Sequence, residues 1–424
     1  MAEPATLDCD VAVVGAGPAG SACAHWLARA GCRVLLIERS RFDAPRVGES
    51  LAPAVQPLLR ELGVWERFAA LHPWPSWGTR SLWGAEEEQS HSHMVSAWGC
   101  GWHVDRLAFD RMLADAAVSA GACRLDGTAV QACEAGPGGW RLSLAATPGT
   151  TRPRTAGRWP VARRAAAHAG PRQLTAAVLV DATGRSASLA RRLGAQRLLF
   201  DRLVGVAAQW SRAENGTPSR PRPPQQVVTV ETVPLGWWYS APLPGSARVS
   251  AATRGEVVDH GMVGMLFTDA DLCGRHDLAS LARWQAGLAD APLTSERLAG
   301  RSLRWGPCPC SAVSQRLRRR ERQAPWLAVG DAALAVDPIS GSGVVRALRT
   351  AKAASGAALG LLATGADTAR PSAALEAYEA ELDSECTRYL RERALYYGLE
   401  QRWQAAEFWQ RRGLRQPAGR GAEA

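Results

Sequence analysis

The sequence predicts an α/β protein with a doubly wound, Rossmann-like domain, a second domain built on a mixed β-sheet, and a helical C-terminal region. Three observations predict this fold. An apolar run at residues 10–14 leads through a glycine-rich turn into a helical segment, and a second apolar run at residues 33–37 ends in an acid. Residues 203–302 alternate polar and apolar side chains between Pro and Gly turns, as the strands of a sheet do. A chain of 424 residues is long enough for two such domains.

The N-terminal segment predicts a strand, a helix and a second strand. Residues 10–14 form a continuous apolar run, which is typical of a buried parallel strand. Residues 21–30 have helical composition, with Pro18 suited to the first helical turn and Gly31 to the end of the helix. Residues 33–37 predict the next strand. This order is a βαβ unit.

A Gly-x-Gly-x-x-Gly turn joins the first strand to the helix. Its first glycine permits a tight turn, its second lets a pyrophosphate approach the backbone, and its third lets the helix pack on the strand. Glu38, which ends the next strand, is placed to accept hydrogen bonds from ribose hydroxyls. This context favours a dinucleotide site over a glycine-rich turn without a ligand. The residues of the turn are Gly15, Ala16, Gly17, Pro18, Ala19 and Gly20.

Composition and periodicity predict the remaining elements. We expect helices at residues 50–70, 104–120, near 277–290, 343–363 and 372–412. We expect strands at residues 123–132, 176–180 and 326–329, and a mixture of strand and loop at 74–103. Residues 147–173 are rich in Pro, Arg and Ala and predict an exposed basic excursion. The charged run 316–322 predicts a solvated connection.

These elements suggest a division into domains that are discontinuous in the sequence. Residues 1–78, 99–199 and 303–370 are assigned to the nucleotide-binding domain. Residues 79–98 and 200–302 are assigned to a substrate-binding domain, and residues 371–424 to the C-terminal helical region.

Charge and hydropathy limit the partners that we expect. The net charge is +10, and Lys352 is the single lysine, so arginine supplies nearly all of the positive charge. No nucleic-acid motif accompanies this charge, and nucleic acid is therefore not an expected partner. No apolar run is long enough for a membrane span. The polar, acidic N-terminus lacks a signal pattern, so we expect a cytoplasmic protein.

No metal site is expected. Cys308 and Cys310 form the one close cysteine pair, and the second half of a zinc site is missing. His91 and His93 alternate as on a strand, with His103 nearby. They could bind a metal, one of them could act as a general base, or all could be solvated or core histidines. No catalytic residue is assigned on this evidence.

A second glycine motif lies near residue 330. A predicted strand ends on Gly330 and Asp331, and the loop that follows contains Pro338. The carboxylate can accept hydrogen bonds from a polyhydroxyl chain. The amides of residues 341–343 open a helix and can face a group that gains negative charge.

With both glycine motifs, the sequence resembles the aromatic flavin hydroxylases and flavin-dependent halogenases. Residues 330–333 and 337–343 resemble the flavin ribityl motif of that family, and residues 181–185 resemble its middle Asp-Gly motif. Val104-Asp105-Arg106, followed by Phe109-Asp110, resembles the segment whose arginine contacts the cofactor, and Arg46 with residues 48–50 resembles the loop on the flavin side. The motifs occur in the family's order over nearly the whole chain.

The resemblance implies a domain of the glutathione-reductase type that binds FAD without a covalent bond. It also implies that the flavin is reduced by NAD(P)H or by a separate flavin reductase, because no second dinucleotide motif is present. Besides the glycine turn, the implied cofactor-binding residues are Glu38, Arg39, Arg46, Ser50, Arg106, Val130, Asp181, Gly184, Gly330, Asp331, Pro338, Gly341, Ser342, Gly343 and Val344.

The resemblance is divided between halogenation and hydroxylation. Residues 236–242 partly match a halogenase motif, but the lysine that halogenases use is missing, and Ser340 replaces a family glutamate. What the family then implies is hydroxylation of an aromatic ring through a flavin C4a-hydroperoxide. Trp237, Trp238 and Tyr239 could wall the substrate pocket or could be core aromatics of the second domain.

The halogenase motifs of this sequence are incomplete. In this respect the sequence is similar to the flavoprotein monooxygenases of tryptophylquinone cofactor biogenesis, which act in the maturation of quinohemoprotein amine dehydrogenase. That branch implies an aromatic substrate, namely a tryptophan side chain of a polypeptide, with its maturation complex as a partner. The alternatives are a hydroxylase or halogenase of a small aromatic natural product, an FAD-dependent reductase of isoprenoid double bonds, and a flavin-bound scaffold without turnover.

Overall fold

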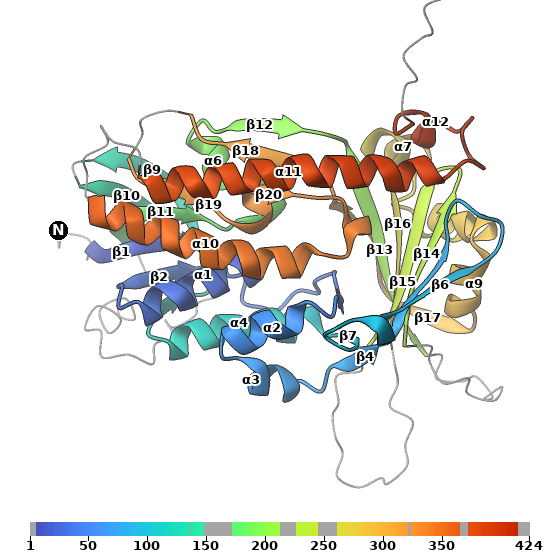
Figure 1. Ribbon diagram of the computed structural model, residues 1–424, viewed down its shortest axis with the longest axis horizontal. Coiled ribbons are helices and arrows are strands. Elements are labelled where there is room, and N and C mark those ends of the chain that lie inside the picture. Colours follow the sequence, from blue (N-terminus) through green and yellow to red (C-terminus); the bar gives the residue numbers. More distant parts are fainter. Residues whose placement is uncertain are drawn as a thin grey trace, which may run out of the picture. The chain divides into compact units, whose positions relative to one another are not determined.

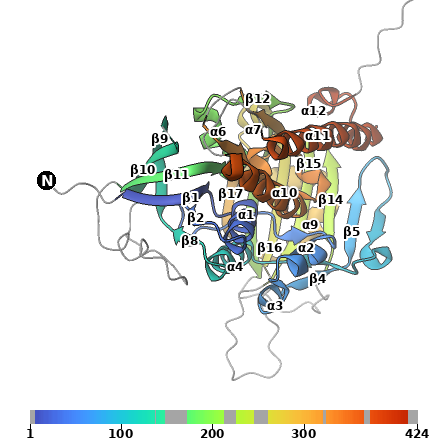
Figure 2. The same cartoon turned by 60° about the vertical axis from the view of Figure 1, so that its left-hand side comes forward.

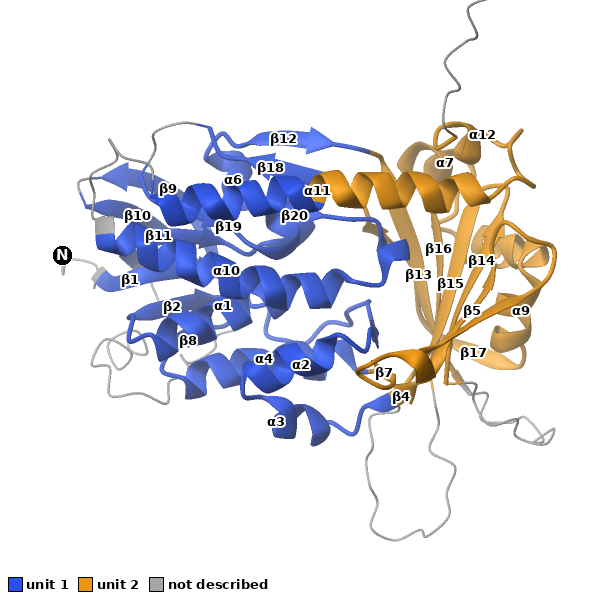
Figure 3. Ribbon diagram, in the orientation of Figure 1, with its two compact units in different colours: residues 1–74, 104–200, 313–385 blue, residues 75–103, 201–312, 386–424 orange. Residues whose placement is uncertain are grey.

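The computed structural model of the chain describes residues 6–136, 138–147, 172–212, 226–244, 261–320, 324–364 and 372–413. Nearly all of the predicted basic excursion at 147–173 lies outside these residues. The chain forms two compact units, coloured separately in Figure 3. Unit 1 comprises residues 1–74, 104–200 and 313–385, and unit 2 comprises residues 75–103, 201–312 and 386–424. Compactness alone does not assign a function to a unit, so the functional domain bounds stay a prediction.

A seven-stranded sheet forms the centre of unit 1. Its order is β8 (Cys123–Leu125), β2 (Val34–Ile37), β1 (Thr6–Val14), β11 (Arg172–Asp181), β10 (Gly139–Ala146) and β9 (Thr128–Gly136), and β19 (Trp326–Ala328) also pairs with β11. β8, β2, β1, β11 and β19 are parallel, whereas β10 and β9 are antiparallel. The apolar runs of β1 and β2 are almost fully buried, as the sequence predicts for parallel strands.

Helices cover this sheet. α1 (Pro18–Arg29) packs against α10 (Gly343–Thr364) and α4 (Arg106–Ser119), and Figures 1 and 2 both show α1 and α10 side by side. The predicted helices at 21–30, 104–120 and 343–363 are therefore confirmed. The shorter elements of unit 1 are β3 (Ser50–Leu51), α2 (Val55–Glu61), α3 (Trp65–Ala69), η2 (Gly184–Ser186), α6 (Ser188–Arg192), η4 (Gly330–Ala332), η5 (Pro338–Ser340), and a small sheet of β12 (Gln196–Leu199), β18 (Gln315–Arg318) and β20 (Leu334–Ala335).

A second seven-stranded sheet forms unit 2. Its order is β17 (Arg301–Ser311), β13 (Leu203–Arg212), β16 (Gly261–Asp269), β15 (Gly236–Leu243), β14 (Val228–Val233), β5 (Gly78–Leu82) and β6 (Gln89–Ser92). Only β14 and β5 pair in parallel among these neighbours, so the sheet is mixed, as predicted. The segment of residues 74–103 also contains β4 (Trp74–Ser76), η1 (His93–Val95) and β7 (Gly101–His103).

The prediction of a single helix near residues 277–290 is wrong. Unit 2 has three short helices there, α7 (Ala270–Arg275), α8 (Leu281–Ala286) and α9 (Pro292–Leu298), with the turn η3 (Gly287–Asp290) between the last two. Ser280 caps α8 by accepting from the Arg283 N–H, and Pro292 begins α9. These local start signals divide a segment whose average composition is helical.

The C-terminal segment is also less continuous than predicted. α11 (Ala373–Leu399) ends before Glu400, and the four-residue α12 (Glu407–Gln410) follows. The Glu400 carboxylate is buried and accepts hydrogen bonds from the Gly84 N–H at 3.0 Å and the Thr232 hydroxyl at 2.5 Å. These tertiary contacts hold the chain in a turn where composition alone predicts more helix.

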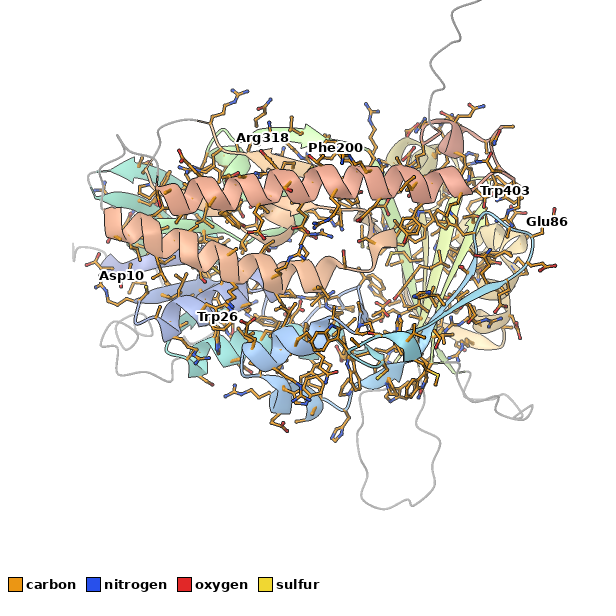
Figure 4. The ribbon with its side chains drawn as sticks, viewed as in Figure 1. Asp10, Trp26, Glu86, Phe200, Arg318 and Trp403 are labelled. Carbon is orange, nitrogen blue, oxygen red and sulfur yellow. The ribbon has the colours of Figure 1, made fainter. Side chains whose placement is uncertain are left out.

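The prediction of a solvated connection at residues 316–322 is wrong for Arg316. Its side chain is 1% exposed and forms ion pairs with Glu379 at 2.5 Å and Asp383 at 2.9 Å. Arg318, labelled in Figure 4, is half exposed and pairs with the same Asp383. Arg316 and Arg318 are two residues apart in β18 and lie on the same face of the strand, where carboxylates on α11 compensate the buried charge of Arg316.

Candidate functional site

The glycine turn of unit 1 leaves no room for side chains at its first and third glycines. Gly15 has a φ of +109°, and a Cβ there would lie 2.2 Å from the Ala182 carbonyl oxygen. A Cβ on Gly20 would lie 1.9 Å from the Gly15 carbonyl oxygen. The turn is therefore packed against the chain that follows β11, and only glycine fits at these two positions.

The middle glycine has the opposite surroundings. No atom lies within 4 Å of the position that a Cβ on Gly17 would occupy. Gly17 is the N-cap of α1, and Pro18 follows it at the first helical position. The N–H groups of Ala19 and Gly20 have no intrahelical acceptor because they lie in the first turn. An open surface with free donors at the positive end of a helix fits a pyrophosphate.

Glu38 lies directly beyond β2 and is tied to the glycine turn. One of its carboxylate oxygens accepts the Ala16 N–H at 2.7 Å, and the other accepts the N–H and hydroxyl of Ser40 at 2.9 and 2.7 Å. A carboxylate oxygen can accept more than one hydrogen bond. Glu38 is thus held in place and keeps capacity for ribose hydroxyls.

Two of the predicted arginines meet on Asp110 of α4. Arg46 donates to Asp110 at 2.7 Å and to the Ser40 hydroxyl at 2.8 Å. Arg106 donates to Asp110 at 3.3 Å and to the carbonyls of Val47 and Gly48 at 3.1 and 2.9 Å. Asp110 is 1% exposed, so it anchors the loop that carries residues 46–48 from inside the unit. Sequence reasoning did not assign Asp110 to the site, although its spacing of four residues from Arg106 on one helix is a signal for such a pair.

The side chain of Asp181 forms its hydrogen bonds with residues that follow it closely in the sequence. Its carboxylate accepts the N–H groups of Thr183 and Ala190 at 2.8 and 2.6 Å, and it is fully buried. Burial raises the pKa of Asp181, and these hydrogen bonds oppose that rise. The adjoining backbone, through Ala182, supports Gly15. Gly184 has a φ of +67° in the same turn.

Asp331 is held by Arg185, a second residue that sequence reasoning did not assign. The Arg185 guanidinium lies 3.3 Å from the Asp331 carboxylate and donates to the carbonyls of Val313 and Val336 at 2.7 and 2.8 Å. Its signal in the sequence was its place at the end of the Asp-Ala-Thr-Gly-Arg motif. Asp331 keeps a third of its side-chain surface exposed, which fits an acceptor for a polyhydroxyl chain.

The start of α10 forms the other part of the predicted site. Asp337 accepts the Ile339 N–H at 3.0 Å and orders the turn η5, which begins at Pro338. No atom lies within 4 Å of a Cβ built on Gly341 or on Gly343. α10 has 22 residues, so its first N–H groups present the positive end of a long helix dipole. Ser342 and Val344 flank Gly343 at this end.

The remaining predicted cofactor residues are Arg39, Ser50 and Val130. Arg39 is exposed next to Glu38, and Ser50 is half-buried in β3. The Val130 carbonyl accepts a hydrogen bond from Arg192 at 2.9 Å.

The residues present fit FAD. Unit 1 contains four features that suit FAD. They are the open glycine surface at the start of α1, the open glycine surface at the start of α10, an acid after β2 and an acid after β19. They match a pyrophosphate, a flavin ring edge, a ribose and a ribityl chain, respectively. The assignment of each residue to each part of FAD stays a prediction.

The three candidate pocket residues lie on β15 of unit 2. Trp238 is fully buried among core residues and meets Trp284 edge-on at 4.7 Å between ring centroids. Trp237 is 1% exposed, stacks on Phe267 at 4.0 Å, and its ring N–H donates to the Tyr397 hydroxyl at 3.1 Å. Tyr239 is only partly buried. Trp238 therefore has a packing role, and Tyr239 has the exposure that a pocket residue needs.

The candidate histidines His91, His93 and His103, all in unit 2, differ from one another in their surroundings. His91 is exposed, and the ring of His93 lies 3.0 Å from the Ser76 carbonyl oxygen through Nδ1. His103 is fully buried, and neither of its ring nitrogens has a hydrogen-bond partner among the described residues. Within the same part of the chain, no three His, Cys, Asp or Glu side chains come together as a metal site. The search for membrane spans in those residues finds no helix with the necessary length and hydropathy.

The burial of His103 predicts a dependence of stability on pH. Burial, and then the charges of Arg297 and His93, lower the pKa of His103 to about 3. The unfolded chain binds a proton near its ordinary pKa of 6.5, whereas the fold does not, so stability falls as the pH drops below that value. By about pH 5 the loss is ~2 kcal/mol. We expect His103→Gln to lose that much less than the parent between neutral pH and pH ~5 in urea unfolding. Exposed His91→Gln is the matched control, and equal pH dependence in the parent and His103→Gln would contradict the assignment.

Comparisons with known proteins agree with an FAD-binding fold. A family model described as an FAD binding domain matches residues 8–147. A protein of Marinomonas mediterranea described as "Putative FAD-dependent oxidoreductase LodB" is 28% identical over 410 residues, which cover 95% of this chain and 96% of that protein. Menaquinone reductase of Mycobacterium tuberculosis is 30% identical over 81% of this chain and 75% of its own length.

Solved structures with a similar fold include a halogenase and a tryptophan dihydroxylase. The myxobacterial chondrochloren halogenase CndH superposes with a TM-score of 0.75 at 22% identity, covering 97% of this chain and 87% of that one. The peptidyl tryptophan dihydroxylase QhpG, described as essential for tryptophylquinone cofactor biogenesis, superposes with a TM-score of 0.67 at 26% identity. That match covers 97% of this chain and 79% of QhpG.

Proposed function

Because the chain belongs to the FAD-dependent oxidoreductases and is similar to flavin-dependent halogenases, we propose that it hydroxylates an aromatic ring in a tryptophan side chain of a polypeptide. The likeness to the peptidyl tryptophan dihydroxylase QhpG supports a polypeptide substrate, and it extends over nearly the whole chain. A maturation complex that presents this polypeptide is part of the proposal.

The position of the one lysine is the observation that favours hydroxylation rather than halogenation. Lys352 lies nine residues into α10, which is ~14 Å along the axis from Gly343 at 1.5 Å per residue. Its ammonium forms an ion pair with Glu61 and lies 5.7 Å from the ring of Trp26, which is labelled in Figure 4. The side chain is more than half exposed. The lysine that the resemblance to halogenases requires is therefore engaged elsewhere on unit 1.

The residues of the chain bind and orient the cofactor in this proposal. When bound and reduced, FAD supplies the two electrons with which O2 places one oxygen atom in the ring and leaves the other as water. The open turn at Gly17 binds the pyrophosphate, and Glu38 binds the ribose. Asp110 holds Arg106 and also Arg46, whose guanidinium lies 3.7 Å from the Glu38 carboxylate. The N-terminus of α10 stabilises the negative charge that develops on reduction.

The experiment supplies the enzyme with FAD, a flavin reductase, NADH, O2 and bromide, together with a tryptophan-bearing polypeptide or with free tryptophan and indole. We expect a gain of oxygen on the polypeptide and no bromine on any product, measured by mass spectrometry. A reaction without the flavin reductase is the control. Bromine on a product, or oxygen on free indole alone, would contradict the proposal.

Halogenation of a small aromatic compound is the second candidate. The segment of residues 48–50 and the motif that begins at Gly236 favour it, and the fold of CndH is compatible with it. Reduction of an isoprenoid double bond is favoured by the 30% identity to menaquinone reductase. An anaerobic incubation with a prenylated quinone separates this activity, because it needs no O2.

A further inference from the structure

Arg346 is a buried arginine in the first turn of α10 that uses only part of its guanidinium. Its side chain is 5% exposed. Nε donates to the Glu385 carboxylate at 3.0 Å, and Nη2 donates to the Ser342 hydroxyl at 2.8 Å. Nη1 is buried and has no hydrogen-bond partner among the residues that the structure describes.

The guanidinium lies beside the part of unit 1 that is assigned to the flavin. Side chains of a helix lean toward its N-terminus, and the bond to Ser342 places that of Arg346 at the start of α10. The Asp331 carboxylate, on the loop after β19, is close enough to act on its charge. Arg346 is therefore next to both segments that we expect to hold the ribityl chain and the ring edge.

Several charged groups surround this helix start. Arg346 and Arg349 share the Glu385 carboxylate, at 3.0 and 2.6 Å. Arg185 pairs with Asp331 at 3.3 Å. Three guanidinium groups face the carboxylates of Glu385 and Asp331, and the buried Asp337 carboxylate lies in the turn before α10. The helix dipole adds positive potential at this helix start. Burial lowers the pKa of Arg346, but guanidinium groups remain protonated at neutral pH.

An unpaired N–H of a buried charged group destabilises the fold unless something else accepts from it. We propose that Arg346 is a positioning residue for the cofactor, and that its free N–H and positive charge stabilise the negative charge that FAD gains on reduction. FAD takes up two electrons and one proton from NAD(P)H or a flavin reductase, so the bound flavin gains one negative charge. This inference rests on the placement of FAD at the start of α10.

The test compares Arg346→Met with Arg349→Met, in chloride-free buffer so that no small anion replaces the ligand. Arg349 also binds Glu385, but it is half exposed and lies one turn further along α10. For each variant, the ratio of the affinities for reduced and oxidised FAD is obtained from the midpoint potential of the bound flavin. We expect Arg346→Met to lower that ratio at least tenfold, a shift of ~30 mV to more negative potential for a two-electron couple. Arg349→Met should stay within about twofold, and Arg346→Lys should recover most of the loss.

Two further measurements separate the possible failures. The unfolding midpoint of each apoprotein reports any purely structural role of Arg346, and a lower midpoint with an unchanged affinity ratio would overturn the inference. Gly343→Val tests the placement of FAD itself, because its side chain would enter the open space at the start of α10. If Gly343→Val leaves FAD affinity unchanged, the placement fails. If it weakens binding while Arg346→Met keeps the parental ratio, only the role of Arg346 fails.

Discussion

Gly17→Val is expected to weaken FAD binding by roughly 30- to 150-fold while the apoprotein stays folded. The Cβ of the new side chain would meet no protein atom within 4 Å, and the φ of −73° and ψ of −177° at Gly17 suit valine. It would instead occupy the space that we assign to the pyrophosphate, and the loss of charge-assisted hydrogen bonds there costs ~2–3 kcal/mol. FAD affinity is measured by quenching of flavin fluorescence, and folding by thermal unfolding without FAD.

Gly274→Val is the matched control for this variant. Gly274 lies in α7 of unit 2, and a Cβ there also meets nothing within 4 Å. It should leave FAD affinity unchanged. Parental FAD affinity in Gly17→Val would remove the glycine turn from the cofactor site.

Trp238→Ala is expected to lower the free energy of unfolding by ~3–5 kcal/mol, the usual cost of removing a buried tryptophan ring. Its ring is fully buried and contacts the ring of Trp284, which is itself fully buried. Chemical unfolding followed by tryptophan fluorescence measures the loss. Tyr239→Phe on the same strand is only partly buried and should change stability by less than about 0.5 kcal/mol. A stable Trp238→Ala with lost activity would instead identify Trp238 as a wall of the substrate pocket.

Patterns that are local in the sequence predicted the fold well. The apolar run at residues 10–14 extended into β1, and the glycine turn that follows it leads into α1, as the βαβ pattern requires. The small-residue segment at 343–363 became α10 almost to the residue. These elements are encoded by short-range periodicity and by glycine positions, which do not depend on the rest of the chain.

Contacts between distant segments could not be predicted in the same way. Arg316 is buried because α11 supplies Glu379 and Asp383, more than sixty residues away. The carboxylate of Asp181 is enclosed by its own turn, although the motif alone suggests a contact with the cofactor. Asp110 and Arg185 are as central to the geometry as the predicted residues. Spacing on α4 signals the pair of Arg106 and Asp110, but the contacts of Asp110 with Arg46 and of Arg185 with Asp331 join segments that are far apart in the sequence.

The most direct test of the central claim is a single turnover under isotopically heavy O2. The enzyme, FAD, a flavin reductase and NADH would act on a polypeptide that carries tryptophan, with free indole and bromide present. The polypeptide would be digested, and all products would be analysed by mass spectrometry. The proposed function predicts one heavy oxygen atom on a tryptophan side chain for each hydroxylation, and no bromine. Oxygen that comes from water, bromine on the ring, or an unmodified polypeptide beside a modified small aromatic compound would contradict it.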